Sequence, residues 1–406
     1  MANLPLHGGK APPYLFHRMV RLSGAITMAI VAEYGPQEML RRLADPWWFQ
    51  AFGCMLGFDW HSSGVTTVTC GALKEAQRLY GDHLGILVAG GKGGTSRKAP
   101  AEITGAADRL GITGGDRLVY ASRMSAKVDS AAVQDGFDVY AHSFFFVPGG
   151  AWCVVQQGMN ELSGYARRYH WLGESVNDFV CEPHAAIHDL SGDHMPAPTV
   201  AATESQVTLP LLNMVAEEAG ANRQASAALV RANPDKLLGI IEAHTQGPTL
   251  FAPAHHPVLP TDVNLERLRK IVITAHERNP EDFEMLLGTP NVGPATIRSL
   301  ALIAELIYDA PVSRRDPAER SGVQSPKSKV QSSTSETALA GGERRWADYS
   351  YAHGGKDGHP FPVDRATYDR SIAVLEEAVR KARVGEMDKA QALKRLVAVS
   401  QIPRQD

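Results

Sequence analysis

The pattern of apolar and polar residues divides the chain into a mixed region, residues 1–195, and a helical region, residues 206–311. In the mixed region, a short apolar run at Gly85–Ala89 ends in a glycine-rich loop, which is typical of a buried strand. Residues 138–147 and 151–157 flank a Pro-Gly-Gly turn and predict a β-hairpin. Strands and helices are interspersed here, so we expect an α/β or α+β domain.

Helices are predicted wherever apolar residues recur every three or four positions. In the mixed region the expected helices are 14–42, 122–135 and 165–172, while residues 65–79 are β-branched at first and then helix-like. The second region is wholly helical in its pattern, with predicted helices at 207–219, 223–232, 234–244, 263–278, 280–287 and 294–308. We therefore expect residues 206–311 to form an all-α domain.

Residues 312–345 differ in composition from the rest of the chain. Ser, Lys, Arg, Gly, Gln and Pro dominate and large apolar residues are nearly absent, so the segment predicts a flexible insertion. In residues 346–406, loops rich in Gly and Pro lead into two amphipathic helices, which we expect to pack on the helical domain.

Bulk composition narrows the class of protein. Of the 406 residues, 44% are hydrophobic and 21% charged, as in an ordinary soluble protein of two or three domains. The N-terminus shows no secretory signal, no long apolar run follows, and the four cysteines form no Cys-x-x-Cys pair. We therefore expect a cytoplasmic protein with no membrane partner. The formal net charge of −3 gives no global attraction to nucleic acid, so any such surface has to be local.

The stretch Leu286–Arg298, LLGTPNVGPATIR, contains a tight turn between two predicted helices. It resembles a helix-hairpin-helix, a module that binds nucleic-acid backbone without reading sequence; a plain helical hairpin is the alternative. Asn291 replaces the first glycine of the usual turn, and asparagine tolerates left-handed backbone better than most residues. N–H groups at the start of the second helix would face a phosphate, with the helix dipole behind them. The expected nucleic-acid contacts are Val292, Gly293, Ala295, Thr296 and Arg298.

Further cations are candidates for nucleic-acid contacts. The segment Gly90–Arg97 follows a predicted strand but lacks the Gly-Lys-Ser/Thr ending of an ATP site. Its Lys92 and Arg97 are therefore predicted to contact nucleic-acid phosphate. Arg167 and Arg168 adjoin aromatic residues on a predicted helix, a combination that favours single-stranded or flipped bases.

Two clusters of polar residues indicate metal-assisted hydrolysis, for which Mg²⁺ or Mn²⁺ is the expected cofactor. Asp59 and His61 lie in a turn between apolar segments, where capping is the alternative role. Lys127, Asp129 and Asp135 precede the predicted hairpin and resemble the carboxylate–strand–lysine layout of metal-dependent nucleases. The match is incomplete, because glutamine stands at the strand end where glutamate is usual.

Two further motifs have the spacing or surroundings of functional residues. His184 and His188 are four positions apart, which predicts a metal site if the segment is helical. Asp364 ends a Pro-Val-Asp segment that resembles the element carrying the essential aspartate of helix-hairpin-helix DNA glycosylases. It lies 71 residues (364 − 293) beyond the turn, several times the usual gap. The hairpin lysine of lyase-type members is missing, so a glycosylase here would lack Schiff-base chemistry.

Long strings along the chain resemble a family known as domain of unknown function 763, found in archaea and some bacteria. These strings are Leu4–Pro13, Phe49–Cys54, Gly57–Gly64, Val88–Gly93, Val154–Met159, Arg167–Trp171 and Ala352–Gly358. The resemblance covers nearly everything except the predicted insertion. It implies no activity and assigns no catalytic residue.

Together these patterns predict a DNA-binding protein of DNA repair or processing. As an enzyme, the chain would be a metal-dependent nuclease. A glycosylase without lyase activity and a non-catalytic nucleic-acid-binding scaffold are the alternatives, and RNA stays open as a partner.

Overall fold

Two compact units make up the chain in a computed structural model, which describes residues 4–5, 12–58, 63–161, 165–188, 211–232, 234–235, 237–239 and 265–318. The N-terminal unit is built mainly from Leu4–Val88, and the sheet unit from Ala89–Phe144 and Pro148–Glu319. This division differs from the expected boundary near residue 195. The predicted site residues Asp59, His61 and Asp364 and the whole segment 346–406 lie outside the described residues.

The N-terminal unit is helical in its described part. Its elements are β1 (Leu4–Pro5), α1 (Pro13–Tyr34), α2 (Pro36–Ala44), α3 (Pro46–Met55), α4 (Gly64–Tyr80) and the short 3-10 helix η1 (Gly81–Leu84). Met19, Leu22 and Ile26 recur at helical spacing on α1 and are buried, and α1 packs against α4. The β-branched start of residues 65–79 is helical as well. Val65, Thr66 and Thr69 are buried in α4, and such packing overrides the β-propensity of branched residues.

Helix α1 is long and apolar enough, by length and composition alone, to cross a membrane. However, 56% of its most apolar 18-residue window is buried inside the structure. Core helices of soluble proteins have the same character, so packing against α4 is a sufficient reason for the apolar sequence of α1. Among the described residues, α1 alone has this length and composition.

The sheet unit is built on a sheet with the strand order β6-β5-β4-β2, and β7 pairs with β6. Its strands are β2 (Leu87–Lys92), β4 (Asp138–Phe146), β5 (Trp152–Asn160), β6 (Tyr165–Leu172) and β7 (Ala186–His188). The predicted strand and the predicted hairpin are confirmed. The helix predicted at 165–172 is wrong, because this segment is β6. Both faces of β6 are buried, so its sequence lacks the apolar–polar alternation that reveals a half-exposed strand.

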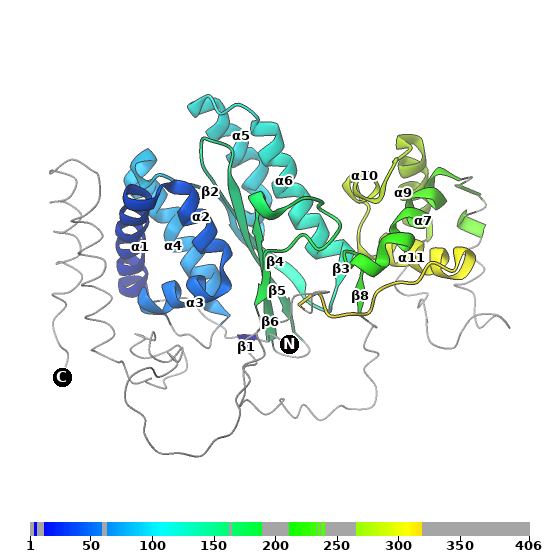
Figure 1. Ribbon diagram of the computed structural model, residues 1–406, viewed down its shortest axis with the longest axis horizontal. Coiled ribbons are helices and arrows are strands. Elements are labelled where there is room, and N and C mark those ends of the chain that lie inside the picture. The colour runs from blue at the N-terminus through cyan, green and yellow to red at the C-terminus, as the bar shows by residue number, and fades with distance from the viewer. Residues whose placement is uncertain are drawn as a thin grey trace, which may run out of the picture. The chain divides into compact units, whose positions relative to one another are not determined.

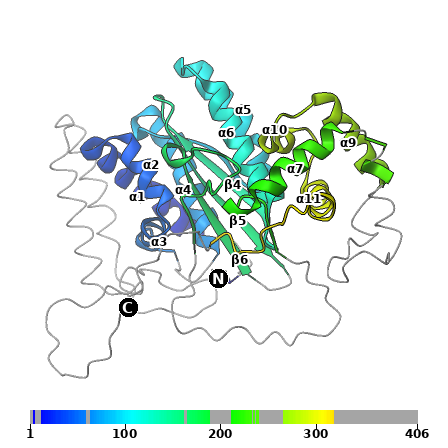
Figure 2. The same cartoon turned by 45° about the vertical axis from the view of Figure 1, so that its right-hand side comes forward.

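Helices pack on this sheet and extend away from one end of it. The helical elements are η2 (Gly93–Lys98), α5 (Ala99–Leu110), α6 (Gly115–Lys127), the π-helical turn η3 (Val128–Ala132), η4 (Gly173–Ser175), η5 (Glu217–Ala219), α7 (Gly220–Arg231), α9 (Leu265–Arg278), α10 (Phe283–Gly288) and α11 (Pro294–Tyr308). Both Figure 1 and Figure 2 show α6 running between the sheet and the group formed by α7, α9, α10 and α11. Helix α6 and its continuation η3 therefore connect the sheet to the helical group.

Short strands and an ordered strap complete the unit. β3 (Val133–Gln134) pairs antiparallel with β8 (Leu212–Asn213). The helix predicted at 207–219 is therefore wrong over its described part, which holds β8 and η5. The predicted flexible insertion is also wrong at its start, because Ser313 forms a β-bridge with Asn213. We call residues 313–318 the strap.

Candidate nucleic-acid interface and its buried support

The turn between α10 and α11 is the candidate interface. Helix α10 begins after Asp282, whose side chain accepts a hydrogen bond from the Met285 N–H at 2.8 Å. Asn291 has a φ of 65°, so the left-handed conformation expected from its replacing glycine is confirmed. Gly293 is extended, with a φ of −138°, and a Cβ there would meet only the Asn291 carbonyl at 3.9 Å. A side chain would therefore fit there, and the turn requires no left-handed conformation of Gly293.

The start of α11 presents backbone donors. Pro294 occupies the first helical position, and no side chain caps the helix at Gly293. The N–H groups of Ala295 and Thr296 belong to the first turn, where intrahelical acceptors are lacking. Ala295 is exposed, whereas the side chains of Val292 and Thr296 are buried. Any contact from these last two residues to a ligand would therefore come from the backbone. Arg298, one turn into the helix, is half-buried.

Lys127 supports this turn from behind. It ends α6, and its Nζ donates to the carbonyl oxygens of Val292 and, at 3.5 Å, Thr289. Gln134 of β3 adds a hydrogen bond from Nε2 to the Pro294 carbonyl, at 2.9 Å. Burial lowers the pKa of the half-buried Lys127 ammonium. In this structure the Lys127 ammonium binds the carbonyls of the turn, and its predicted catalytic role stays a prediction.

A buried chain of hydrogen bonds joins α6 to the sheet. The Gln156 Nε2 donates to the Asp129 Oδ2 at 2.6 Å and to the Ser125 carbonyl at 3.2 Å, so the Gln156 Oε1 faces the other way. That oxygen lies 2.9 Å from the His142 Nδ1, which must therefore carry a hydrogen. Burial lowers the pKa of His142, and in the neutral ring its Nε2 accepts the Ser122 hydroxyl at 2.9 Å.

Asp129 is the central acceptor of this buried network. Its Oδ2 also accepts from the Trp171 indole N–H at 2.9 Å, and its Oδ1 accepts from the His184 Nε2 at 2.5 Å. The Asp129 side chain is fully buried. Protein donors engage both carboxylate oxygens, and the predicted catalytic role of Asp129 stays a prediction. Its geometry fixes η3 against β5 and β6.

A second buried cluster surrounds Arg167. The Arg167 guanidinium pairs with the Asp135 Oδ2 at 2.7 Å and the Asp316 Oδ2 at 2.9 Å, and its side chain is 1% exposed. The Tyr169 hydroxyl donates to the same Asp135 oxygen at 2.8 Å. Burial raises the pKa of Asp135, against the opposing effects of Arg167 and Tyr169. Both side chains are buried. The catalytic role predicted for Asp135 and the nucleic-acid contact predicted for Arg167 stay predictions.

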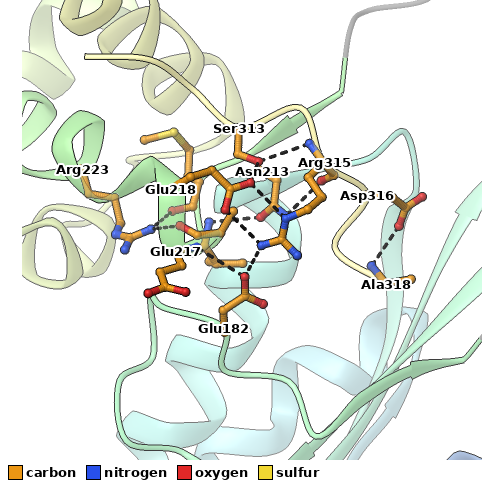
Figure 3. A network of polar contacts seen from close by, with 12 residues as sticks. Glu182, Asn213, Glu217, Glu218, Arg223, Ser313, Arg315, Asp316 and Ala318 are labelled. Carbon is orange, nitrogen blue, oxygen red and sulfur yellow. Dashed lines mark hydrogen bonds and ion pairs between the residues drawn. The ribbon is translucent and has the colours of Figure 1, made fainter. Parts of the chain in front are cut away.

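The strap closes this side of the unit through a network of ion pairs, which Figure 3 shows. Arg315 bonds to Glu182 and, at 3.0 Å, to Glu218, and Ser313 donates to Glu218 at 2.6 Å. Asn213 donates from its side chain to the Arg315 carbonyl at 3.1 Å. The Arg315 side chain is 19% exposed, so these pairs are partly shielded from water. The strap therefore joins β8, η5 and the segment before β7.

The predicted glycine-rich loop begins inside β2, which ends at Lys92, and continues as the 3-10 helix η2 before α5. Gly90 has a φ of 83°, and a Cβ there would lie 2.2 Å from the His142 carbonyl oxygen, so only glycine fits. Lys92 and Arg97 are exposed, and the Lys92 Nζ lies 5.5 Å from the ring centre of Tyr140. Their predicted phosphate contacts stay predictions. Arg168, by contrast, is fully buried in β6, so the predicted direct contact from a helix surface is wrong.

The predicted metal site at His184 and His188 is also wrong in its premise. The segment is extended and enters β7, so four residues span about 13 Å rather than one helical turn. His184 is buried against Asp129, whereas the backbone of His188 lies opposite Arg168. Within the described ranges, no group of three or more His, Cys, Asp or Glu side chains is placed to hold a metal ion.

Several residues of these clusters carried no sequence signal. Ser122 and His142 are 20 positions apart, and Arg167 and Asp316 are 149 apart, so neither pair forms a local motif. The hydrogen bond between Gln157 and Tyr140, at 2.5 Å, also joins residues that form no local sequence motif. The sequence feature that could have indicated these clusters is the concentration of polar residues on strands that are otherwise apolar.

Fold and site define a mixed α/β protein in which buried polar networks hold a helical turn beside a sheet. The chain belongs to the family described as Protein of unknown function (DUF763), whose model matches residues 1–363. The resemblance drawn from the sequence strings is therefore confirmed. No curated protein and no solved structure matches the chain.

Proposed function

We propose that the protein binds nucleic acid, DNA in the first place, through the phosphate backbone at the α10–α11 turn. The observation that carries the proposal is the ammonium of Lys127 bound to the carbonyls of Val292 and Thr289. It places a positive charge behind a turn whose other side presents backbone N–H groups. Charge, donors and the dipole of α11 all favour an anion at the same place.

Backbone recognition fits the chemistry of the turn better than base recognition does. Ala295 is small and exposed, and the side chains of Val292 and Thr296 are buried, so the turn offers few groups that read base edges. Phosphate contacts position a protein on nucleic acid without selecting sequence. The overall charge of −3 restricts binding to such a local site.

The proposal contains no catalytic step. Asp129 and Asp135 are buried and bonded to protein donors, and Lys127 is bound to the turn. A role of Asp59, His61 or Asp364 in DNA cleavage or base removal stays a prediction.

A charge substitution on the turn tests the proposal without weakening the helix. Ala295→Glu places a carboxylate at the second position of α11, where the dipole favours it by about 0.3–1 kcal/mol. The same carboxylate repels a phosphate. We expect the Kd for a fluorescent 20-base-pair duplex to rise about tenfold, a loss of about 1.4 kcal/mol, with an unchanged melting temperature.

The matched control is Ala221→Glu, because Ala221 is exposed and is likewise the second residue of its helix, α7. It adds the same charge at the same helical position and should leave the Kd within about twofold. Two duplexes of unrelated sequence should bind equally well, and an RNA duplex in parallel decides between DNA and RNA. Equal binding by wild type and Ala295→Glu would refute the assignment of the turn.

A further inference from the structure

A row of polar side chains runs across four neighbouring strands of the sheet, β6, β5, β4 and β2. Arg168 of β6 lies directly opposite Gln157 of β5 in the antiparallel register. The Gln157 Nε2 donates to the Tyr140 hydroxyl oxygen at 2.5 Å. The Lys92 Nζ, at the end of β2, lies 5.5 Å from the centre of the Tyr140 ring. These four residues, which come from four neighbouring strands, are called the Lys92–Arg168 row.

Register places Arg168, the buried end of this row, on the face of β6 that is opposite to Asp135. Successive residues of a strand point to opposite faces, and Arg167 and Tyr169 bond to Asp135 on the α6 side. Arg168 between them therefore points to the other side. Burial decreases along the row, since Arg168 and Gln157 are fully buried, Tyr140 is half-buried and Lys92 is exposed. The row thus connects a buried guanidinium to the surface.

The row presents donors and positive charge. The Tyr140 oxygen accepts the Gln157 amide hydrogen, so its own hydroxyl hydrogen points elsewhere and is available to an acceptor. Burial raises the pKa of Tyr140, which keeps that hydrogen in place. Arg168 is always charged and lies at the buried end of the row. Lys92 adds an ammonium at the exposed end.

We infer that the Lys92–Arg168 row binds a phosphoryl group, with Lys92 and Tyr140 in contact with it and Arg168 contributing charge from the buried end. The adjoining loop leaves room for such a ligand, because a Cβ at Gly93 or Gly94 would meet nothing within 4 Å. The phosphoryl group belongs either to free phosphate or to a nucleic-acid strand. This inference is independent of the proposed function, since the row shares no residue with the α10–α11 turn.

Calorimetric titration of the full chain with inorganic phosphate, and separately with a 5′-phosphorylated thymidine dinucleotide, tests the inference. Lys92→Met and Tyr140→Phe should each weaken binding about tenfold, because each removes a donor to a charged ligand. Lys98→Met is the matched control. It removes an exposed lysine from the same loop and should leave binding unchanged.

Each outcome decides the inference. Binding of phosphate, or of the dinucleotide alone, that both substitutions weaken supports the row and identifies the source of the phosphoryl group. Binding that Lys92→Met and Tyr140→Phe leave intact, or that Lys98→Met weakens equally, overturns it, as does no binding of either probe. Both substituted side chains are at least partly exposed, so these variants should keep the wild-type melting temperature, which is measured first.

Discussion

The two faces of strand β6 use neighbouring arginines for different purposes. Arg167 lies between the carboxylates of Asp135 and Asp316 and is part of a closed set of ion pairs. Arg168, one residue later, is adjacent to Gln157, whose hydrogen bond to Tyr140 extends the row toward Lys92. On one face the guanidinium is paired with two carboxylates, and on the other it lies opposite an amide that hydrogen-bonds to a tyrosine. Residue type alone therefore says little about the role of an arginine; the facing strands decide it.

The largest expected effect on stability comes from breaking the ion pairs of Arg167. Asp135→Ala removes a fully buried carboxylate and leaves the Arg167 guanidinium with one partner fewer in the interior. We expect the free energy of unfolding to fall by about 3–5 kcal/mol, the usual cost of breaking a buried ion pair. Urea unfolding measures it. A loss below about 1 kcal/mol would show that the Asp135–Arg167 pair is not buried as described.

A smaller effect is expected at the other buried carboxylate. Asp129→Asn keeps the shape but turns an NH₂ group toward the donors of Gln156, Trp171 or His184. Losing hydrogen bonds to a charged acceptor should cost about 2–3 kcal/mol in urea unfolding. Asp138→Asn, on an exposed aspartate at the start of β4, is the control and should change stability by less than about 0.5 kcal/mol.

The smallest expected effect concerns the pH dependence of stability that His142 causes. Burial lowers the pKa of His142, so the unfolded chain takes up a proton there before the folded chain does. The stability that neutral His142 contributes is fully present above its unfolded pKa of about 6.5 and is lost as the pH falls from there toward the folded pKa. His142→Asn should therefore flatten the fall in unfolding free energy between about pH 7 and pH 5. Identical pH dependence in both proteins would contradict the neutral, hydrogen-bonded ring.

The sequence predicts local features of this fold well where one physical reason suffices. The hairpin of β4 and β5 follows from its Pro-Gly-Gly turn, and the left-handed Asn291 follows from its place in a glycine turn. The sequence predicts a helix where β6 lies, because arginines are usually exposed and those of β6 are buried. Only the tertiary partners explain such burial, and Asp316 lies 149 residues from Arg167.

Gln156 shows how a site can be misread for a physical reason. A glutamate at this place would complete a nuclease-like pattern, so the glutamine makes the match to that pattern incomplete. In the structure the side chain accepts from His142 and donates to Asp129, which requires an amide and excludes an ionised carboxylate. The residue that weakened the sequence interpretation is the one that joins the two halves of the buried network.

The most direct test of the proposed function is the salt dependence of DNA binding by wild type and Lys127→Gln. Glutamine keeps an N–H donor for the turn carbonyls but carries no charge, so it separates support of the turn from electrostatic attraction. Wild type should bind duplex DNA, and Lys127→Gln should bind about fivefold more weakly at low salt, with a log–log salt slope shallower by up to about one. Equal affinities and equal slopes, or no binding by wild type, would contradict a phosphate-binding turn charged by Lys127.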